Sequence, residues 1–247
     1  MTHAVIGYAA YLPRYRLAGA DIGLRRGDRV VASFDEDSTT MAVAAAAAAV
    51  AGHPAPQNLY FATSSPAYAD KTNATAIHSA LGLPNETFAT DMCGTGRSAF
   101  AAWRAAAATG GLVVAADVRV GRPGSPDEKL GGDGAAALLF GEGPGIAEIL
   151  ATTSLTSEFL DRWRSPTLLT GQQWEERFGA ERYGELVVAA VRRALDGAGA
   201  TGADHVVLTC PNSAIVKRAT TLVKGEKSTV TSPIGFLGAA DSSVALC

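Results

Sequence analysis

Short, continuously apolar segments alternate with alanine-rich segments in the first part of the chain. Two of the apolar segments, Asn58–Thr63 and Leu112–Asp117, have the length and composition of strands buried in a sheet. The segment Thr39–Ala51 is nearly all alanine and valine, which predicts a helix of small residues, buried all round. This order of elements predicts an α/β protein with a layered sheet. Further strands are expected at His3–Tyr8, Thr87–Thr90, Ile146–Ser154 and His205–Thr209, and further helices at Asn73–Leu81, from the Cys93 turn to Ala108, and at Tyr183–Leu195.

The size of the chain allows one large α/β domain or two smaller layered halves. Its 247 residues, 47% of them hydrophobic, can bury a large core. Beyond Thr156 the composition changes, because charged and aromatic residues occur together in Glu158–Arg164. We therefore expect two halves, residues 1–155 and 156–247.

Charge and cysteine content exclude several classes of function. A net charge of −3 gives no electrostatic basis for binding nucleic acid or an anionic membrane. The first residues lack a signal-peptide pattern and no apolar run reaches membrane-spanning length, so we expect a cytoplasmic protein. The three cysteines, Cys93, Cys210 and Cys247, are too widely spaced for a disulfide framework or a zinc pair. Reduced thiols are expected, and no metal or redox cofactor is indicated.

Cys93 stands between a strand-like segment and an alanine-rich helical segment, in Asp91–Arg104. A thiol on a sharp turn at a helix N-terminus is stabilised as the thiolate, which is the nucleophilic form. Cys93 is therefore a candidate nucleophile. The alternative is a small buried cysteine beside a turn, and the local pattern alone favours that alternative.

Other polar residues have a structural interpretation beside a functional one. The acids and serine of Asp35–Ser38 are expected to cap the helix that follows. The glycines around Asp133 are expected to let backbone pass behind a reactive turn, with Asp133 hydrogen-bonded to that turn. For Trp163 and Trp174 the two interpretations are lining a pocket and packing under a loop. For Lys217 and Arg218 they are contacting a phosphate and facing water.

Six motifs stand in a fixed order along the chain: Asp35–Ala42, Ala62–Lys71, the turn at Cys93, Gly132–Ala136, Cys210–Asn212 with Lys217, and Gly235–Ala240. In this order they resemble the hydroxymethylglutaryl-CoA synthases of the archaeal and actinobacterial type, and the resemblance extends over nearly the whole chain. That family belongs to the thiolase superfamily, with the type III ketoacyl synthases. The resemblance implies a layered α-β-α-β-α sandwich of two related halves and favours Cys93 as the nucleophile.

The same resemblance implies chemistry and partners. Cys93 would take an acyl group from an acyl-CoA or acyl-carrier substrate, and backbone N–H groups near Gly94 or Gly238 would bind the oxyanion. Lys217 and Arg218 are candidate contacts for coenzyme A, which is a substrate and not a bound cofactor. A homodimer is implied, as is a partner protein with a zinc ribbon and an OB fold.

At three positions the chain departs from the family pattern. Ser64 stands where the family has glutamate, Thr209 where it has histidine, and Phe236 where it has asparagine. Neither serine nor threonine can replace a glutamate base, and phenylalanine offers no hydrogen bond; Cys210, beside the histidine position, is a further candidate. The second half is also shorter than in the family, which would leave a sheet edge uncovered, so we expect either a shortened form or a partner that fills the gap. Three functions remain open: a condensing acyltransferase, an acyl carrier that does not condense, and a non-catalytic scaffold subunit.

Overall fold

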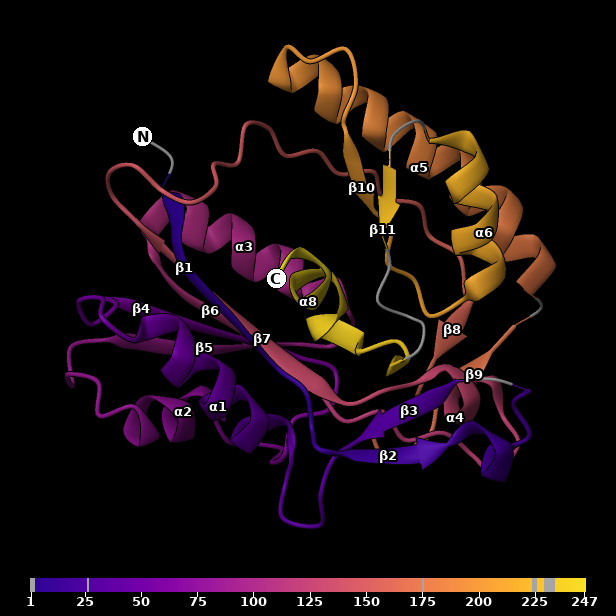
Figure 1. The fold of residues 1–247 in the computed structure, drawn as a ribbon, viewed down its shortest axis with the longest axis horizontal. Helices are drawn as coiled ribbons and strands as arrows, with labels where there is room; N and C mark the ends of the chain where they lie inside the picture. Colours follow the sequence, from indigo (N-terminus) through magenta and orange to yellow (C-terminus); the bar gives the residue numbers. More distant parts are fainter. Residues whose placement is uncertain (1–2, 26, 175, 224–225, 229–233) are drawn as a thin grey trace.

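A five-stranded mixed sheet forms the centre of the molecule (Figure 1). The computed structural model describes residues 3–25, 27–174, 176–223, 226–228 and 234–247. The strand order is β1 (Ala4–Tyr11), β7 (Gly134–Gly141), β6 (Gly111–Asp117), β4 (Asn58–Thr63), β5 (Phe88–Cys93). Strand β4 pairs in parallel with β5 and β6, whereas β7 is antiparallel to both β6 and β1. The apolar segments at residues 58–63 and 112–117 are thus confirmed as central strands.

Helices cover both faces of this sheet. Helices α1 (Ser38–Val50) and α2 (Ala74–Ala80) lie on one face, and α3 (Ser98–Thr109) and α8 (Asp241–Leu246) on the other (Figure 1). Alternation along the strands divides the core, because Phe61 packs among residues of α1 whereas its neighbour Tyr60 packs among residues of α3. The short helix η2 (Gly238–Ala240) joins the α3 side, so the end of the chain returns to the first sheet.

Helix α1 follows the sequence prediction at its start and departs from it in burial. Asp37 is the N-cap: its carboxylate accepts from the backbone N–H of Thr40 at 2.7 Å, and the Thr40 hydroxyl accepts from the N–H of Asp37. The expected capping is confirmed for Asp37, whereas the carboxylates of Asp35 and Glu36 accept hydrogen bonds from Ser33 and the Ser38 hydroxyl donates to the Ser65 carbonyl. The expectation of burial all round is wrong, since Ala47 and Ala48 are exposed. The helix packs against β1, β6 and β7 and against α2.

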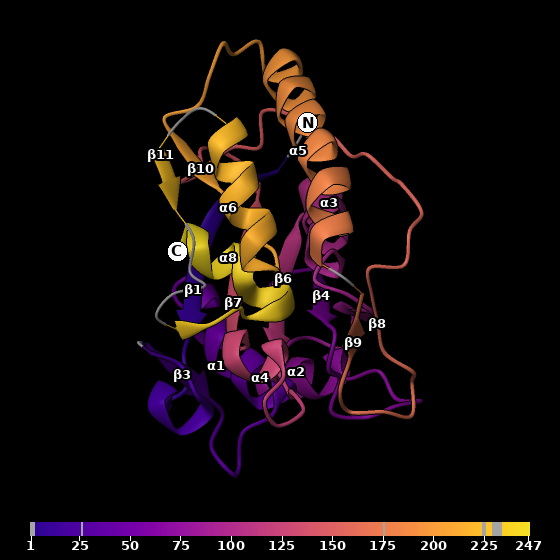
Figure 2. The ribbon, with the colours of Figure 1, turned by 90° about the vertical axis from the view of Figure 1, so that its right-hand side faces the viewer.

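The second half of the chain adds a smaller sheet and two long helices. Strand β10 (His205–Val207) pairs in parallel with β11 (Glu226–Ser228), and helices α5 (Glu176–Ala198) and α6 (Ser213–Leu222) pack side by side (Figure 2). With the first sheet and its helices this gives the α-β-α-β-α order that the sequence predicts, and the second half is the smaller one. The boundary near residue 155 remains a prediction.

One predicted strand is absent, and short elements that were not predicted occur in the loops. The strand expected at Ile146–Ser154 is absent; this exposed segment makes one isolated bridge, from Ala147 to Val5. It follows Gly143, Pro144 and Gly145, and it has no buried face to hold it in a sheet. The segment between β6 and β7 contains the short helix α4 (Pro126–Leu130), whose N-cap is Ser125. Two ribbons complete the structure, β2 (Tyr15–Ala18) with β3 (Asp28–Val31), joined through η1 (Gly19–Ile22), and β8 (Arg162–Trp163) with β9 (Gln172–Gln173).

Within the described ranges, none of the helices is both long enough and apolar enough to cross a membrane.

Candidate active site

The carboxylate of Asp117 connects three segments of the fold. Asp117 is the last residue of β6 and is fully buried. It accepts hydrogen bonds from the Thr63 hydroxyl at 2.8 Å, from the Ser64 N–H at 2.6 Å and from the Ser64 hydroxyl at 2.7 Å. It also accepts from the N–H and hydroxyl of Ser65 and, at 2.6 Å, from the N–H of Ala239. A buried carboxylate is stable only with such a set of donors, so Asp117 fixes the ends of β4, β6 and η2 together.

A cavity of about 700 Å³ opens beside this cluster. It lies where the carboxyl ends of the parallel strands meet the second half of the chain, the usual position of ligand sites in α/β proteins. The residues that line it from the first half include Ser64, Gly94, Gly96, Arg97, Phe100 and Arg119, and those from the second half include Asp161, Arg164, Tyr183, Thr209, Cys210, Phe236 and Gly238.

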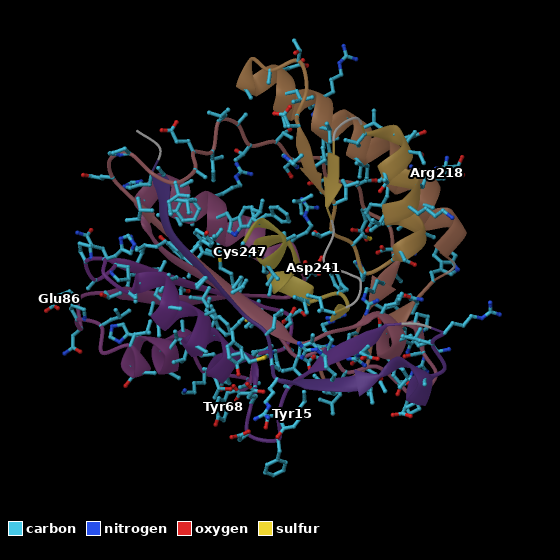
Figure 3. All side chains as sticks on the ribbon, viewed as in Figure 1. Tyr15, Tyr68, Glu86, Arg218, Asp241 and Cys247 are labelled. Carbon is cyan, nitrogen blue, oxygen red and sulfur yellow. The ribbon has the colours of Figure 1, made fainter. Side chains whose placement is uncertain are left out.

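Four of the site residues predicted from sequence line this cavity. They are Ser64, Thr209, Cys210 and Gly238. Cys93 is not among the lining residues, although the next residue, Gly94, is. Lys217 and Arg218 are exposed on α6 and are not among the residues that line the cavity. Figure 3 shows Arg218 on this helix.

Cys93 has a different environment from the one predicted. It ends β5 beside Thr63 of β4, and it is exposed. Helix α3 begins only at Ser98, so the thiol lies outside the first helical turn and gains little from the helix dipole. Partial burial raises the pKa of the Cys93 thiol, and the charges of Asp91 and Asp117 raise it further. The expected stabilisation of the thiolate is therefore wrong for this structure.

Asp133 also bonds elsewhere than predicted. Its carboxylate accepts from the N–H of Ala32 at 2.8 Å and from the N–H of Arg119 at 2.7 Å, not from the turn at Cys93. Burial raises the pKa of this carboxyl. The neighbouring Gly132 does allow a close approach of backbone, because a Cβ there would overlap the carbonyl of Ile234. The segment that passes Gly132 is thus the one that leads to Phe236.

The backbone conformation and close packing at position 238 require a glycine. Its φ is +60°, and a Cβ there would overlap the carboxylate of Asp117. The N–H of Gly238 donates no hydrogen bond to any residue that the structure describes, whereas the N–H of Gly94 donates to the carbonyl of Thr63 at 3.1 Å. Of the two predicted oxyanion donors, Gly238 is the one with its N–H available.

The wall from the second half carries a thiol and a phenol. Thr209 and Cys210 follow β10, which ends at Val207, two residues earlier than predicted. Burial raises the pKa of the Cys210 thiol. The Tyr183 hydroxyl donates to Asp161 at 2.7 Å, and burial followed by this bond raises its pKa. Neither group is ionised near neutral pH.

Sequence reasoning missed the arginines of the cavity. Arg119 donates from Nη1 to the Ser64 hydroxyl at 3.2 Å, and its guanidinium lies 5.7 Å from the centre of the Phe236 ring. Arg164 donates from Nη2 to the Ser64 carbonyl at 2.6 Å. The only sequence signal for these arginines was the group of charged residues around Trp163. Trp163 also lines the cavity, and its exposed fraction is 38%. Trp174 lies outside it.

Curated proteins with similar sequences have one function in common. The chain matches no protein-family model. It is 34% identical over 216 residues to hydroxymethylglutaryl-CoA synthase of Methanopyrus kandleri, a match that spans 76% of this chain and 61% of the relative, so less than two thirds of that protein. It is 30% identical over 258 residues to the synthase of Methanocella arvoryzae, across 94% of this chain and 74% of the relative. The chain belongs to the hydroxymethylglutaryl-CoA synthase family. The resemblance in the ordered segments is thereby confirmed.

Solved structures agree on the fold of this family member. The 3-oxoacyl-(acyl carrier protein) synthase III of Pseudomonas aeruginosa PAO1 is similar to the whole chain, with a TM-score of 0.88, 20% identity and 88% of that protein covered. A hydroxymethylglutaryl-CoA synthase complexed with coenzyme A gives a TM-score of 0.82 at 18% identity, with the whole chain and 74% of that protein covered. The thiolase-like fold predicted from the sequence is therefore confirmed.

Proposed function

We propose that this chain is an acyl-CoA-dependent acyltransferase of the Claisen-condensing type that works through a thioester on Cys93. The observation that supports it is the common cavity of Ser64, Thr209 and Gly238, which also includes Gly94 beside the thiol. These positions come from separate motifs of the synthase family. The fold places them around one space large enough for a thioester substrate.

The first step exchanges one thioester for another. The Cys93 thiolate attacks the carbonyl carbon of the acyl-CoA, a C–S bond to Cys93 forms, and the C–S bond to coenzyme A breaks. Coenzyme A leaves as a thiolate and takes up the proton that Cys93 lost. The oxyanion that develops on the carbonyl needs a donor, and the available N–H of Gly238 is the group we assign to it.

Condensation then needs a base for the second substrate. The Ser64 hydroxyl is a donor to Asp117, and Thr209 and Cys210 are neutral near pH 7, so no lining residue at these positions is a ready base. Asp117 itself is occupied by donors from three segments. These features favour a second candidate, a protein that accepts an acyl group without condensing it, or a scaffold subunit.

Partners follow from the same proposal. Coenzyme A thioesters or acyl-carrier thioesters are the substrates, and Lys217 and Arg218 on α6 are candidate contacts for the coenzyme A phosphates. A homodimer, a zinc-ribbon partner with an OB fold, and a cytoplasmic location are part of the proposal.

The test of acyl loading is the intact mass of the protein after incubation with acetyl-CoA and a panel of longer acyl-CoAs, with free coenzyme A measured in parallel. We expect a mass increase of one acyl group with equal release of coenzyme A, lost in Cys93→Ala and kept in Cys247→Ala. An adduct of equal size in Cys93→Ala would contradict the assignment.

A second measurement separates the two candidates. The loaded protein is given a second acyl-CoA, and the products are analysed by mass spectrometry for a new carbon–carbon bond. Such a product supports the condensing enzyme. Loading without any product, with and without the zinc-ribbon protein encoded nearest to it, supports the carrier.

A further inference from the structure

The cavity carries more positive than negative side chains. Its described lining residues include four arginines and two acids, Arg97, Arg119, Arg162, Arg164, Asp127 and Asp161. Both acids have partners: Asp127 pairs with Arg162 at 2.5 Å, and Asp161 accepts from a tyrosine hydroxyl. The other three arginines therefore have no carboxylate partner among the described lining residues.

Arg119 is one of the partly buried arginines of the cavity. One of its donors, Nη1, reaches the Ser64 hydroxyl, and its guanidinium lies over the Phe236 ring. Its Nε and Nη2 groups donate no hydrogen bond to a residue that the structure describes. Burial lowers the pKa of Arg119, which reflects the cost of a guanidinium held away from water. The nearby carboxylate of Asp117 does not satisfy these donors, because it bonds to Ser64, Ser65 and backbone groups.

Arg164 reaches the same residue from the second half of the chain. Its Nη2 donates to the Ser64 carbonyl at 2.6 Å, so two guanidinium groups contact Ser64, one at its hydroxyl and one at its carbonyl. Ser64 itself is uncharged, and the negative charges that act on Arg119 are those of Asp117 and Asp127. A planar guanidinium with free N–H groups in a cavity binds a carboxylate through two parallel hydrogen bonds, which is stronger than a neutral contact.

The position of this pair indicates which part of a substrate it meets. Arg119 lies over the Phe236 ring and lines the same cavity as Gly238, the assigned oxyanion donor, so the acyl group of a thioester bound at Gly238 shares this cavity with the guanidinium. We propose that Arg119 and Arg164 form an anion subsite that selects acyl groups ending in a carboxylate. This proposal rests on the proposed thioester function. The selectivity of the subsite can nevertheless be measured as binding affinity in a protein that cannot transfer the acyl group.

The test compares succinyl-CoA with butyryl-CoA, whose acyl groups have equal carbon number and differ in the terminal carboxylate. Binding is measured by calorimetry to the Cys93→Ala protein, which cannot form the thioester. We expect succinyl-CoA to bind roughly tenfold more tightly or better. Equal affinities would overturn the subsite.

Substitutions then locate the effect. In the Cys93→Ala background, Arg119→Gln should abolish the preference for succinyl-CoA over butyryl-CoA. Arg164→Gln should reduce the preference and serves as the test if Arg119→Gln does not fold. The matched control is Arg104→Gln, an exposed arginine on α3, which should change nothing. A preference that survives both Arg119→Gln and Arg164→Gln contradicts the proposal.

Titrations with free coenzyme A and with inorganic phosphate distinguish a carboxylate subsite from a phosphate site. Both compounds are added to the same set of proteins. If Arg119→Gln weakens coenzyme A alone as much as succinyl-CoA, the arginine binds a phosphate and the carboxylate subsite is wrong. If the protein prefers succinyl-CoA but the unsubstituted chain forms no adduct on Cys93, the carboxylate subsite stands and the thioester function is contradicted. If both substrates bind with equal affinity and load Cys93 equally, the thioester function stands and the subsite is contradicted.

Discussion

The N–H of Ala239 donates a 2.6 Å hydrogen bond to Oδ2 of Asp117, across 122 residues of the chain. Asp117 belongs to the central sheet, and Ala239 belongs to the segment that returns from the second half. The same carboxylate also holds Ser64, so one buried acid sets the position of two walls of the cavity.

Asp117→Asn should destabilise the fold. One acceptor oxygen becomes an N–H₂ group that faces N–H and O–H donors, and the groups left unpaired are buried. We expect a loss of about 2–4 kcal/mol in the free energy of unfolding, measured by urea denaturation. The exposed Asp204→Asn is the control and should change stability by less than about 0.5 kcal/mol. A loss no larger than that of the control would contradict the role given to Asp117.

Gly238→Ala should be more severe than a usual glycine substitution. The added methyl group overlaps the Asp117 carboxylate, and the left-handed φ of +60° is unfavourable for alanine. We expect a loss of more than about 2 kcal/mol, together with loss of any acyl loading. Gly202→Ala, where a Cβ meets nothing within 4 Å, provides the comparison. Similar stability of the two variants would show that the tight approach at Gly238 is not needed.

The structure shows which sequence predictions could succeed. Strand β4 was predicted at its observed ends because six consecutive residues carry the signal locally, and a cap was predicted within Asp35–Ser38 because the capping pattern spans four residues. The strand predicted at Ile146–Ser154 failed because apolar residues alone do not show whether a neighbouring strand is free to pair.

Contacts between segments far apart in the chain could not be predicted from the sequence. Asp133 was assigned to the turn at Cys93, whereas its donors come from Ala32 and Arg119, which only the folded sheet brings near. Arg119 and Arg164 meet at Ser64 from separate halves, and no spacing in the sequence indicates that meeting. The motif around Cys93 identified it as a candidate nucleophile, but the sequence did not show that helix α3 begins only at Ser98, beyond the thiol.

Asp241 should make stability depend on pH. It is almost fully buried in the first turn of α8 (Figure 3), and burial raises its pKa from 3.8 to about 6. The folded carboxyl then binds its proton more tightly than the unfolded one, so this contribution to stability is complete below pH 4 and is lost as pH rises through about 6. Relative to Asp241→Asn, the unsubstituted protein should lose up to about 3 kcal/mol between pH 4 and 7. Parallel pH profiles for both proteins would contradict this.

The reactivity of Cys93 should require alkaline pH. Its thiol pKa is raised by partial burial and by Asp91 and Asp117, so little thiolate is present at neutrality. We expect the rate of alkylation by iodoacetamide at Cys93, followed by peptide mass spectrometry, to have a midpoint above the ordinary value of about 8.5. N-acetylcysteine is the reference. A midpoint at or below pH 7 would mean that the thiol is activated in solution in a way this structure does not contain.

The residue that carries the acyl group decides whether Cys93 is the nucleophile. The protein is incubated with isotope-labelled acyl-CoA, digested at mildly acidic pH to preserve thioesters, and mapped by peptide mass spectrometry over Cys93, Cys210 and Cys247. We predict label on the Cys93 peptide alone, and none there after treatment with hydroxylamine, which cleaves thioesters. Label on Cys210 instead, or on none of the three, would contradict a thioester at Cys93.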